Sequence, residues 1–167
     1  MDVVMGLVDH LELKKGTRLY FDNYFTSVSL LRNLKFNGIE ATGTLRENRC
    51  AAVMKLLDKK ALKKKRGHMV VSSCDDLLAV RWNDNSIVTV LTNCDEVEPK
   101  KNPSLYSRTA KKTGLVEVPG PTAKYYANMC GVDLCDQSVS TYSCDITSKK
   151  WWWPFYAWTV DVCCVQG

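Results

Sequence analysis

Residues 18–45 read RLYFDNYFTSVSLLRNLKFNGIEATGTL, and the fold class follows from them. Arg18–Phe21 is a short β run rich in large apolar residues. Thr26 or Ser27 then stands where a helix cap is expected, ahead of a leucine-rich segment that stops at an Asn-Gly pair. Ile39–Leu45 is a second β run. These residues therefore predict a strand, a capped helix and a second strand.

The segment before this unit predicts one more helix. Apolar residues recur at helical spacing over Val3–Leu11, and Lys14-Lys15-Gly16 is expected to end the helix. The order helix, strand, helix, strand is typical of an α/β protein built on a parallel sheet.

The middle of the chain has a different pattern. Three short β runs, at Met69–Ser72, Leu77–Trp82 and Ile87–Leu91, predict an antiparallel ribbon. Asp84-Asn85 separates the last two runs and is typical of a hairpin turn. The proline-bearing stretch Cys94–Lys101 predicts a loop.

The last part of the chain returns to a helical pattern. Pro119-Gly120-Pro121 marks a boundary, and the stretch from Thr122 to about Tyr142 is then expected to be helical, with few breakers apart from Gly131. Another helix is expected from Pro154, because proline is tolerated in a first helical turn. The tryptophans Trp151–Trp153 before it either stack on nucleic-acid bases or are buried, and burial is favoured.

Composition and charge narrow the class of protein. The chain has 167 residues, enough for one domain, and no apolar run near the roughly 20 residues that span a bilayer. Its start carries an acid where a signal peptide has basic residues, so we expect a nuclear or cytoplasmic protein without a membrane segment. None of its eight cysteines has a C-x2-C partner, which favours reduced structural thiols over zinc.

A basic cluster precedes the β runs of the middle segment. Its six cations lie within eight residues and are Lys59, Lys60, Lys63, Lys64, Lys65 and Arg66. Such a run suits a phosphate backbone, because each neutralised phosphate releases counterions. A solvated loop or a localisation signal explains it equally well.

Acidic residues are the candidates for chemistry, because the usual serine, P-loop, dinucleotide and zinc-protease motifs are absent. Asp22 follows the first β run, and Asp133 and Asp136 share one face of the expected helix. Carboxylates at such positions suit Mg²⁺ or Mn²⁺, which prefer oxygen ligands and can drive phosphodiester cleavage in pairs. Each residue alone is also explained as a cap or a solvated face.

Three stretches resemble the piggyBac transposase family. They are Leu19–Ser27 (LYFDNYFTS), Thr42–Arg49 (TGTLRENR) and Gly131–Gln137 (GVDLCDQ), and Lys149–Trp152 (KKWW) with the helix after it is also similar. The matches lie in the family's order over nearly the whole chain, which makes the resemblance specific.

The resemblance implies a ribonuclease H-like core interrupted by a β-rich insertion. Residues 1–49 would be part of the core, 50–118 the insertion and 119–167 the C-terminal core helices. Asp22 matches the second catalytic aspartate, Asp133 the third and Asp136 an accessory acid.

The same resemblance implies a metal, a partner and a location. Mg²⁺ or Mn²⁺ would bind Asp22 and Asp133. DNA would be bound through Arg46 and Arg49, with Lys63, Lys64 and Lys65 of the basic cluster as further contacts. A nuclear location follows, together with a possible homodimer formed through regions outside this sequence.

The chain departs from the family pattern in three ways. The first catalytic aspartate is missing, because neither Asp2 nor Asp9 matches its motif, and the cysteine-rich zinc domain is also missing. Cys130 replaces a glycine and is expected to crowd the backbone. The sequence therefore predicts a transposase fragment that is marginally stable and inactive in strand cleavage by itself. The alternative is a domesticated DNA-binding or protein-interaction module with no chemistry.

Overall fold

The computed structural model describes residues 2–50, 65–74, 76–143 and 148–166. The chain forms two compact units, Met1–Ala127 and Asn128–Gly167. Across the described ranges, no helix is long and apolar enough to cross a membrane.

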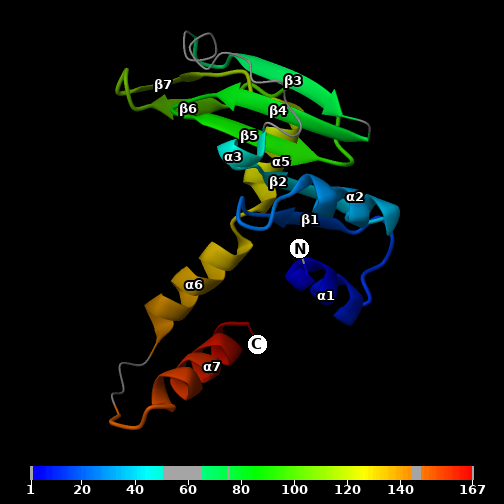
Figure 1. Cartoon of the computed structure of the whole chain (residues 1–167). Coiled ribbons are helices and arrows are strands. Elements are labelled where there is room, and N and C mark those ends of the chain that lie inside the picture. The colour runs from blue at the N-terminus through cyan, green and yellow to red at the C-terminus, as the bar shows by residue number, and fades with distance from the viewer. Residues whose placement is uncertain (1, 51–64, 75, 144–147, 167) are drawn as a thin grey trace. The chain divides into compact units, whose positions relative to one another are not determined.

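A five-stranded sheet in the order β1-β2-β5-β4-β3 is the centre of the first unit (Figure 1). Its strands are β1 (Arg18–Phe21), β2 (Glu40–Thr44), β3 (Met69–Cys74), β4 (Leu77–Asn83) and β5 (Ile87–Thr92). β1 and β2 pair in parallel, whereas every other pair is antiparallel. The α/β class is confirmed, but the sheet is mixed, and the parallel prediction holds only for the first pair.

The antiparallel ribbon is confirmed and extends the same sheet. Asn83 pairs with Ile87 across a short turn, which forces β4 and β5 to run in opposite directions. β5 then pairs with β2, with Thr42 opposite Thr92 and Thr44 opposite Val90. The middle segment therefore continues the sheet that the first strands begin.

The described residues of the first unit also form the helices α1 (Asp2–His10), α2 (Val28–Phe36), α3 (Glu47–Cys50) and α5 (Gly120–Asn128). Ser27 caps α2, since its hydroxyl accepts the Leu30 amide proton at 3.2 Å. α1 ends earlier than predicted, because the backbone turns left-handed at Glu12 with φ 47°. Gly16, the predicted stop, instead has φ 84° in the turn before β1.

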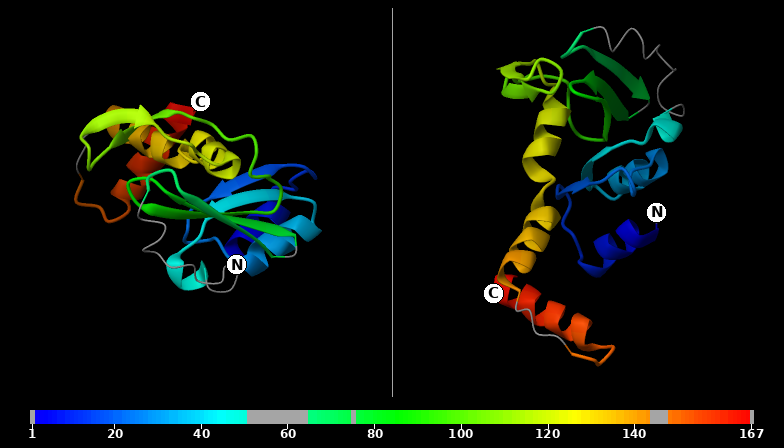
Figure 2. Two further views of the ribbon diagram at one scale, coloured as in Figure 1. Left: turned by 90° about the horizontal axis from the view of Figure 1, so that it is seen from above. Right: turned by 90° about the vertical axis from the view of Figure 1, so that its left-hand side faces the viewer.

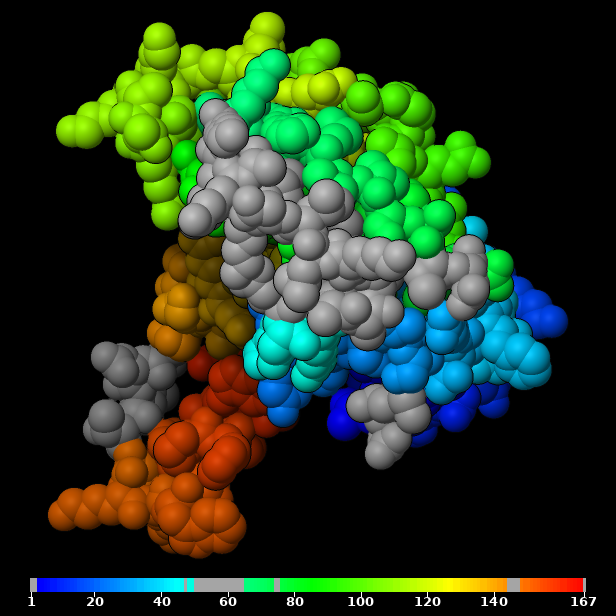
Figure 3. Space-filling view, turned by 45° about the horizontal axis from the view of Figure 1, so that its top comes forward, coloured from blue at the N-terminus to red at the C-terminus, as the bar shows by residue number. Residues whose placement is uncertain are grey.

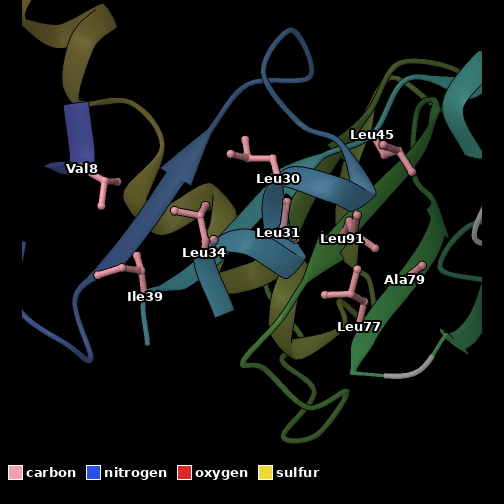
Figure 4. Close-up of a cluster of buried hydrophobic side chains, with 10 residues drawn as sticks. Val8, Leu30, Leu31, Leu34, Ile39, Leu45, Leu77, Ala79 and Leu91 are labelled. Carbon is pink, nitrogen blue, oxygen red and sulfur yellow. The ribbon is translucent and has the colours of Figure 1, made fainter. Parts of the chain in front are cut away.

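Two helices cover opposite faces of the sheet, α2 on one and α5 on the other (Figure 2). Leu30, Leu31 and Leu34 of α2 are fully buried against Ala41 of β2 and Leu91 of β5 (Figure 4). Burying one leucine contributes about 2 kcal/mol, so this face supplies much of the stability of the unit.

A buried asparagine joins α2 to the sheet. The side chain of Asn93 accepts the Ala41 amide proton at 2.8 Å and donates to the Leu31 and Ile39 carbonyls, both at 3.1 Å. One side-chain amide therefore forms hydrogen bonds with three backbone groups.

A second sheet, the β6–β7 hairpin, was not predicted from the sequence. β6 (Ser104–Ser107) pairs antiparallel with β7 (Lys112–Leu115). Behind the hairpin, Trp82 is buried against Val116 and Val118. Its strands are short and largely exposed, so they lack the apolar alternation that marks a strand in sequence.

The second unit pairs α6 (Gly131–Tyr142) with α7 (Trp153–Gln166). The helical stretch predicted from Thr122 to about Tyr142 is present but divided in two, because α5 ends at Asn128 and α6 begins at Gly131. Asparagine and glycine are poor helix formers, which favours a break between them.

Two smaller expectations in this region are wrong. Cys130 is exposed and has an ordinary φ of −83°, so its side chain does not crowd the backbone. Burial fails for Trp151 and Trp152, which are 83% and 41% exposed, whereas Trp153 is half-buried. The Trp152 ring instead packs against the rings of Trp153 and Tyr156.

Candidate functional site

Asp22 stands directly after the end of β1, and its side chain is exposed. Its backbone carbonyl accepts protons from the Phe25 amide at 3.3 Å, the Thr26 amide at 3.2 Å and the Thr26 hydroxyl at 2.8 Å. Its carboxylate accepts the Asn23 amide proton. Residues 22–26 therefore form a compact turn, here called the Asp22 turn, with the carboxylate facing solvent.

Gly43 of β2 makes room for the Asp22 turn. It pairs with Phe21, and a Cβ at this position would lie 2.4 Å from the Thr26 hydroxyl and 2.8 Å from the Phe21 carbonyl oxygen. Real Cβ atoms essentially never approach other heavy atoms this closely. A glycine is thus required for β2 to pack beneath the turn.

Two arginines after β2 hold the other side of the Asp22 turn. Arg46 donates from Nε to the Asn23 side-chain oxygen at 2.8 Å, and its guanidinium lies 5.6 Å from the centre of the Tyr24 ring. Arg49 donates to the Tyr24 carbonyl at 3.2 Å and to the Thr26 carbonyl at 2.8 Å. The two predicted DNA-binding arginines are thus brought beside Asp22, where they bind its turn.

Asp133 and Asp136 lie one turn apart on α6, and both are exposed. Asp133 is in the first turn, where the helix dipole favours a negative charge. The predicted shared face is therefore present. Asp22 belongs to the first unit and these two aspartates to the second, so their meeting at one cation stays a prediction.

Of the three lysines predicted to contact DNA, the structure describes only Lys65. Lys65 is exposed, as phosphate binding requires, whereas Lys63 and Lys64 lie outside the described residues. In the part of the chain that the structure describes, no group of three or more His, Cys, Asp or Glu side chains is gathered to hold a metal ion.

A buried ion pair near β2 was missed by the sequence analysis. The Asp95 side chain is 1% exposed, pairs with Lys124 of α5 and accepts the Thr42 hydroxyl proton at 3.3 Å. Thr92 supports it by accepting the Asp95 amide proton at 3.2 Å. The pair fixes α5 on the sheet. Asp95 falls in a segment predicted as loop, so no pattern in the sequence distinguished it.

Two partly exposed groups near this ion pair, the Cys94 thiol and the Tyr126 hydroxyl, have raised pKa values. Desolvation raises the pKa of the Cys94 thiol above its ordinary value of 9.0. Burial likewise raises the pKa of the Tyr126 hydroxyl above 10.0, and Asp84 adds to the effect. Both groups are therefore neutral near pH 7, which fits a structural thiol at Cys94 better than a reactive one.

Comparison with known proteins identifies the family of this chain. The family model described as Transposase IS4 matches residues 1–165. The human PiggyBac transposable element-derived protein 2 is 35% identical over 165 residues, which are 95% of this chain and 28% of that protein. The human PiggyBac transposable element-derived protein 3 is 36% identical over 133 residues, or 79% of this chain and 22% of that protein. The chain thus spans less than a third of the length of these relatives.

A solved structure has the same fold. It is the cryo-EM structure of the piggyBac transposase synaptic complex with hairpin DNA, with a TM-score of 0.67 and 22% identity. The match covers 98% of this chain and 32% of that one. Since the family model matches nearly every residue, the chain belongs to the Transposase IS4 family, as a piggyBac-type member.

Proposed function

We propose that this chain carries part of the metal-dependent site of a DNA transposase, with Asp22, Asp133 and Asp136 as the acidic residues. The observation that carries the proposal is the Asp22 turn. An exposed carboxylate at the end of a core strand is held in place by Gly43 beneath it and by two arginines beside it. A site that binds cations needs such fixed ligands.

The donor set fits a hard divalent cation. All three side chains are exposed carboxylates, and Mg²⁺ and Mn²⁺ prefer oxygen ligands. Asp22 and Asp133 would hold the ion, and Asp136 would stand beside it as an accessory acid. When bound, such an ion polarises a phosphodiester and activates the attacking hydroxyl group. The chain's own contribution is to fix the carboxylates and to attract the DNA.

Arg46 and Arg49 would have two tasks at this site. Their hydrogen bonds to the Asp22 turn fix the carboxylate, and both side chains remain partly open to solvent. Their positive charge would draw a phosphate backbone toward the acid, with Lys65 as a further contact. DNA is therefore the proposed partner, and a nucleus the proposed location.

We also propose that β1, β2 and α2 belong to a ribonuclease H-like core and that the β-rich segment from β3 to β7 is its insertion. The change in strand direction supports this division. β1 and β2 pair in parallel, as strands on either side of a helix do, whereas all pairing after β2 is antiparallel.

Metal binding tests the proposal directly. Mn²⁺ titrated into the 167-residue chain should release heat with saturation, and Asp22→Asn or Asp133→Asn should abolish it. Asp9→Asn, which removes an exposed carboxylate from α1, is the matched control and should leave the titration unchanged. Saturable uptake that survives both substitutions would contradict the assignment of the ligands.

The activity of the chain by itself is a separate question. The family's first catalytic aspartate has no match in this chain. We therefore expect that the chain by itself does not nick transposon-end DNA with Mg²⁺. A purified chain that nicks such DNA would overturn this expectation.

The second candidate is a DNA-binding module without chemistry, favoured by the exposed cations Arg46, Arg49 and Lys65. Salt-dependent binding of DNA without uptake of Mn²⁺ would select it over the first.

A further inference from the structure

The β6–β7 hairpin carries a basic tip. Arg108, Lys111 and Lys112 lie in or next to its turn, all three are exposed, and the stretch from Pro99 to Val116 contains no acidic residue. No acidic side chain among the described residues forms an ion pair with these three cations, which are here called the basic tip. Within the described ranges, these three exposed charges therefore have no ion-pair partner.

The turn end of the hairpin is held firmly by residues of the main sheet and its turns. Arg66 pairs with Asp84 at 2.6 Å and donates to the Tyr106 carbonyl at 3.0 Å. Asn85 donates to the same carbonyl at 3.0 Å and accepts the Arg108 amide proton at 2.9 Å. Because these bonds fix the end of β6 and the first residue of the turn, the backbone that carries the three cations is ordered, and less conformational entropy is lost when they bind a ligand.

The turn contains a lysine in a backbone conformation that is less favourable for lysine than for glycine. Lys111 has φ 48°, in the left-handed region where glycine or asparagine is the favoured residue. Glycine can therefore replace this lysine without backbone strain, which makes the position suitable for testing the role of the side chain. Here the side chain adds a third positive charge to the tip.

We propose that the basic tip binds the phosphate backbone of double-stranded DNA, an inference that rests on the proposed DNA-binding function. The charge is complementary, since duplex DNA carries about one phosphate charge per 1.7 Å of its axis. The shape also fits, because a two-stranded β ribbon is narrow enough to enter a major groove. Figure 3 shows the yellow-green hairpin standing out from the sheet beside it.

The test measures the binding of duplex DNA to the full chain by fluorescence anisotropy, over a range of salt concentrations. Each lost phosphate contact should make the negative slope of log K against log salt shallower by about 0.9, which corresponds to about a fivefold loss of affinity at ~0.15 M salt. The combined variant Arg108→Gln, Lys111→Gly and Lys112→Gln should then bind about a hundredfold more weakly. Lys14→Gln, which removes an exposed cation near α1, is the matched control and should bind like the wild type.

Lys111→Gly separates binding from folding. Glycine relieves the left-handed backbone, so the melting temperature should stay the same or rise while the affinity for DNA falls about fivefold. A fall in both would mean that Lys111 acts on the hairpin and not on DNA, and would overturn the proposal.

The remaining outcomes are also decisive. If the combined variant binds DNA like the wild type, the basic tip does not bind DNA, and the proposed function is unaffected. If the wild-type chain does not bind duplex DNA at all, both fall. A tip-dependent preference for RNA of the same length over the DNA duplex would overturn the assignment to DNA.

Discussion

Gly43→Ala tests whether the Asp22 turn is built as the structure has it. The added methyl group would lie 2.4 Å from the Thr26 hydroxyl oxygen, 2.8 Å from the Phe21 carbonyl oxygen and 2.9 Å from the Phe21 ring. Ordinary contacts between such atoms lie near 3.5–4.0 Å, so the hydroxyl would have to move by roughly 1 Å. Thr26 is fully buried, which leaves it little room to move.

The cost follows from two terms. Overpacking of this kind costs about 1–3 kcal/mol. Displacing the Thr26 hydroxyl also breaks its 2.8 Å bond to the Asp22 carbonyl, which adds about 1 kcal/mol. We therefore expect Gly43→Ala to lower the free energy of unfolding by about 2–4 kcal/mol, measured by urea denaturation.

Gly114→Ala is the matched control. Gly114 also lies in a strand, β7, but nothing stands within 4 Å of the position its Cβ would take, so this change should be nearly neutral. Thr26→Ala removes the closest clashing atom. Its combination with Gly43→Ala should thus cost less than the sum of the two single changes. Additive effects, or a Gly43→Ala chain as stable as Gly114→Ala, would refute the reasoning.

Three further changes probe the rest of the first unit. Asn93→Ala removes three hydrogen bonds to buried backbone groups and should cost about 2–3 kcal/mol, seen as a lower Tm in circular dichroism; an unchanged Tm would contradict this role. Lys124→Met leaves the Asp95 carboxylate buried without its ion pair and should cost about 2–4 kcal/mol, the lower part of the usual range because Lys124 is partly exposed. Asp95→Asn in the same chain should restore part of that stability, and no recovery would argue against a charge effect. The raised pKa values of Cys94 and Tyr126 contribute stability that is present below their ordinary values of 9.0 and 10.0 and is lost as the pH rises through the raised ones. Urea midpoints should therefore fall at alkaline pH, and the fall should be smaller in a Cys94→Ala, Tyr126→Phe chain.

Local signals determined much of the fold. The strand Arg18–Phe21, the cap at Ser27 and the turn after Asn83 were all expected from the sequence and are all present. Each depends on residues close together in the chain, such as a hydroxyl that accepts an amide proton three residues on. The family was likewise recognisable from short stretches, including the one that holds Asp22.

Tertiary structure decided what joins distant parts of the chain. The antiparallel pairing of β2 with β5 makes the sheet mixed, and the Asp95–Lys124 pair ties a loop to a helix. Neither leaves a local pattern, because each depends on which surfaces meet and not on the spacing of neighbouring residues. The positions of Arg46 and Arg49 beside Asp22 arise in the same way, since β1 and β2 bring their ends together only by pairing in parallel. The acid and the arginines could be picked out from the sequence, but only the pairing of β1 with β2 brings them side by side.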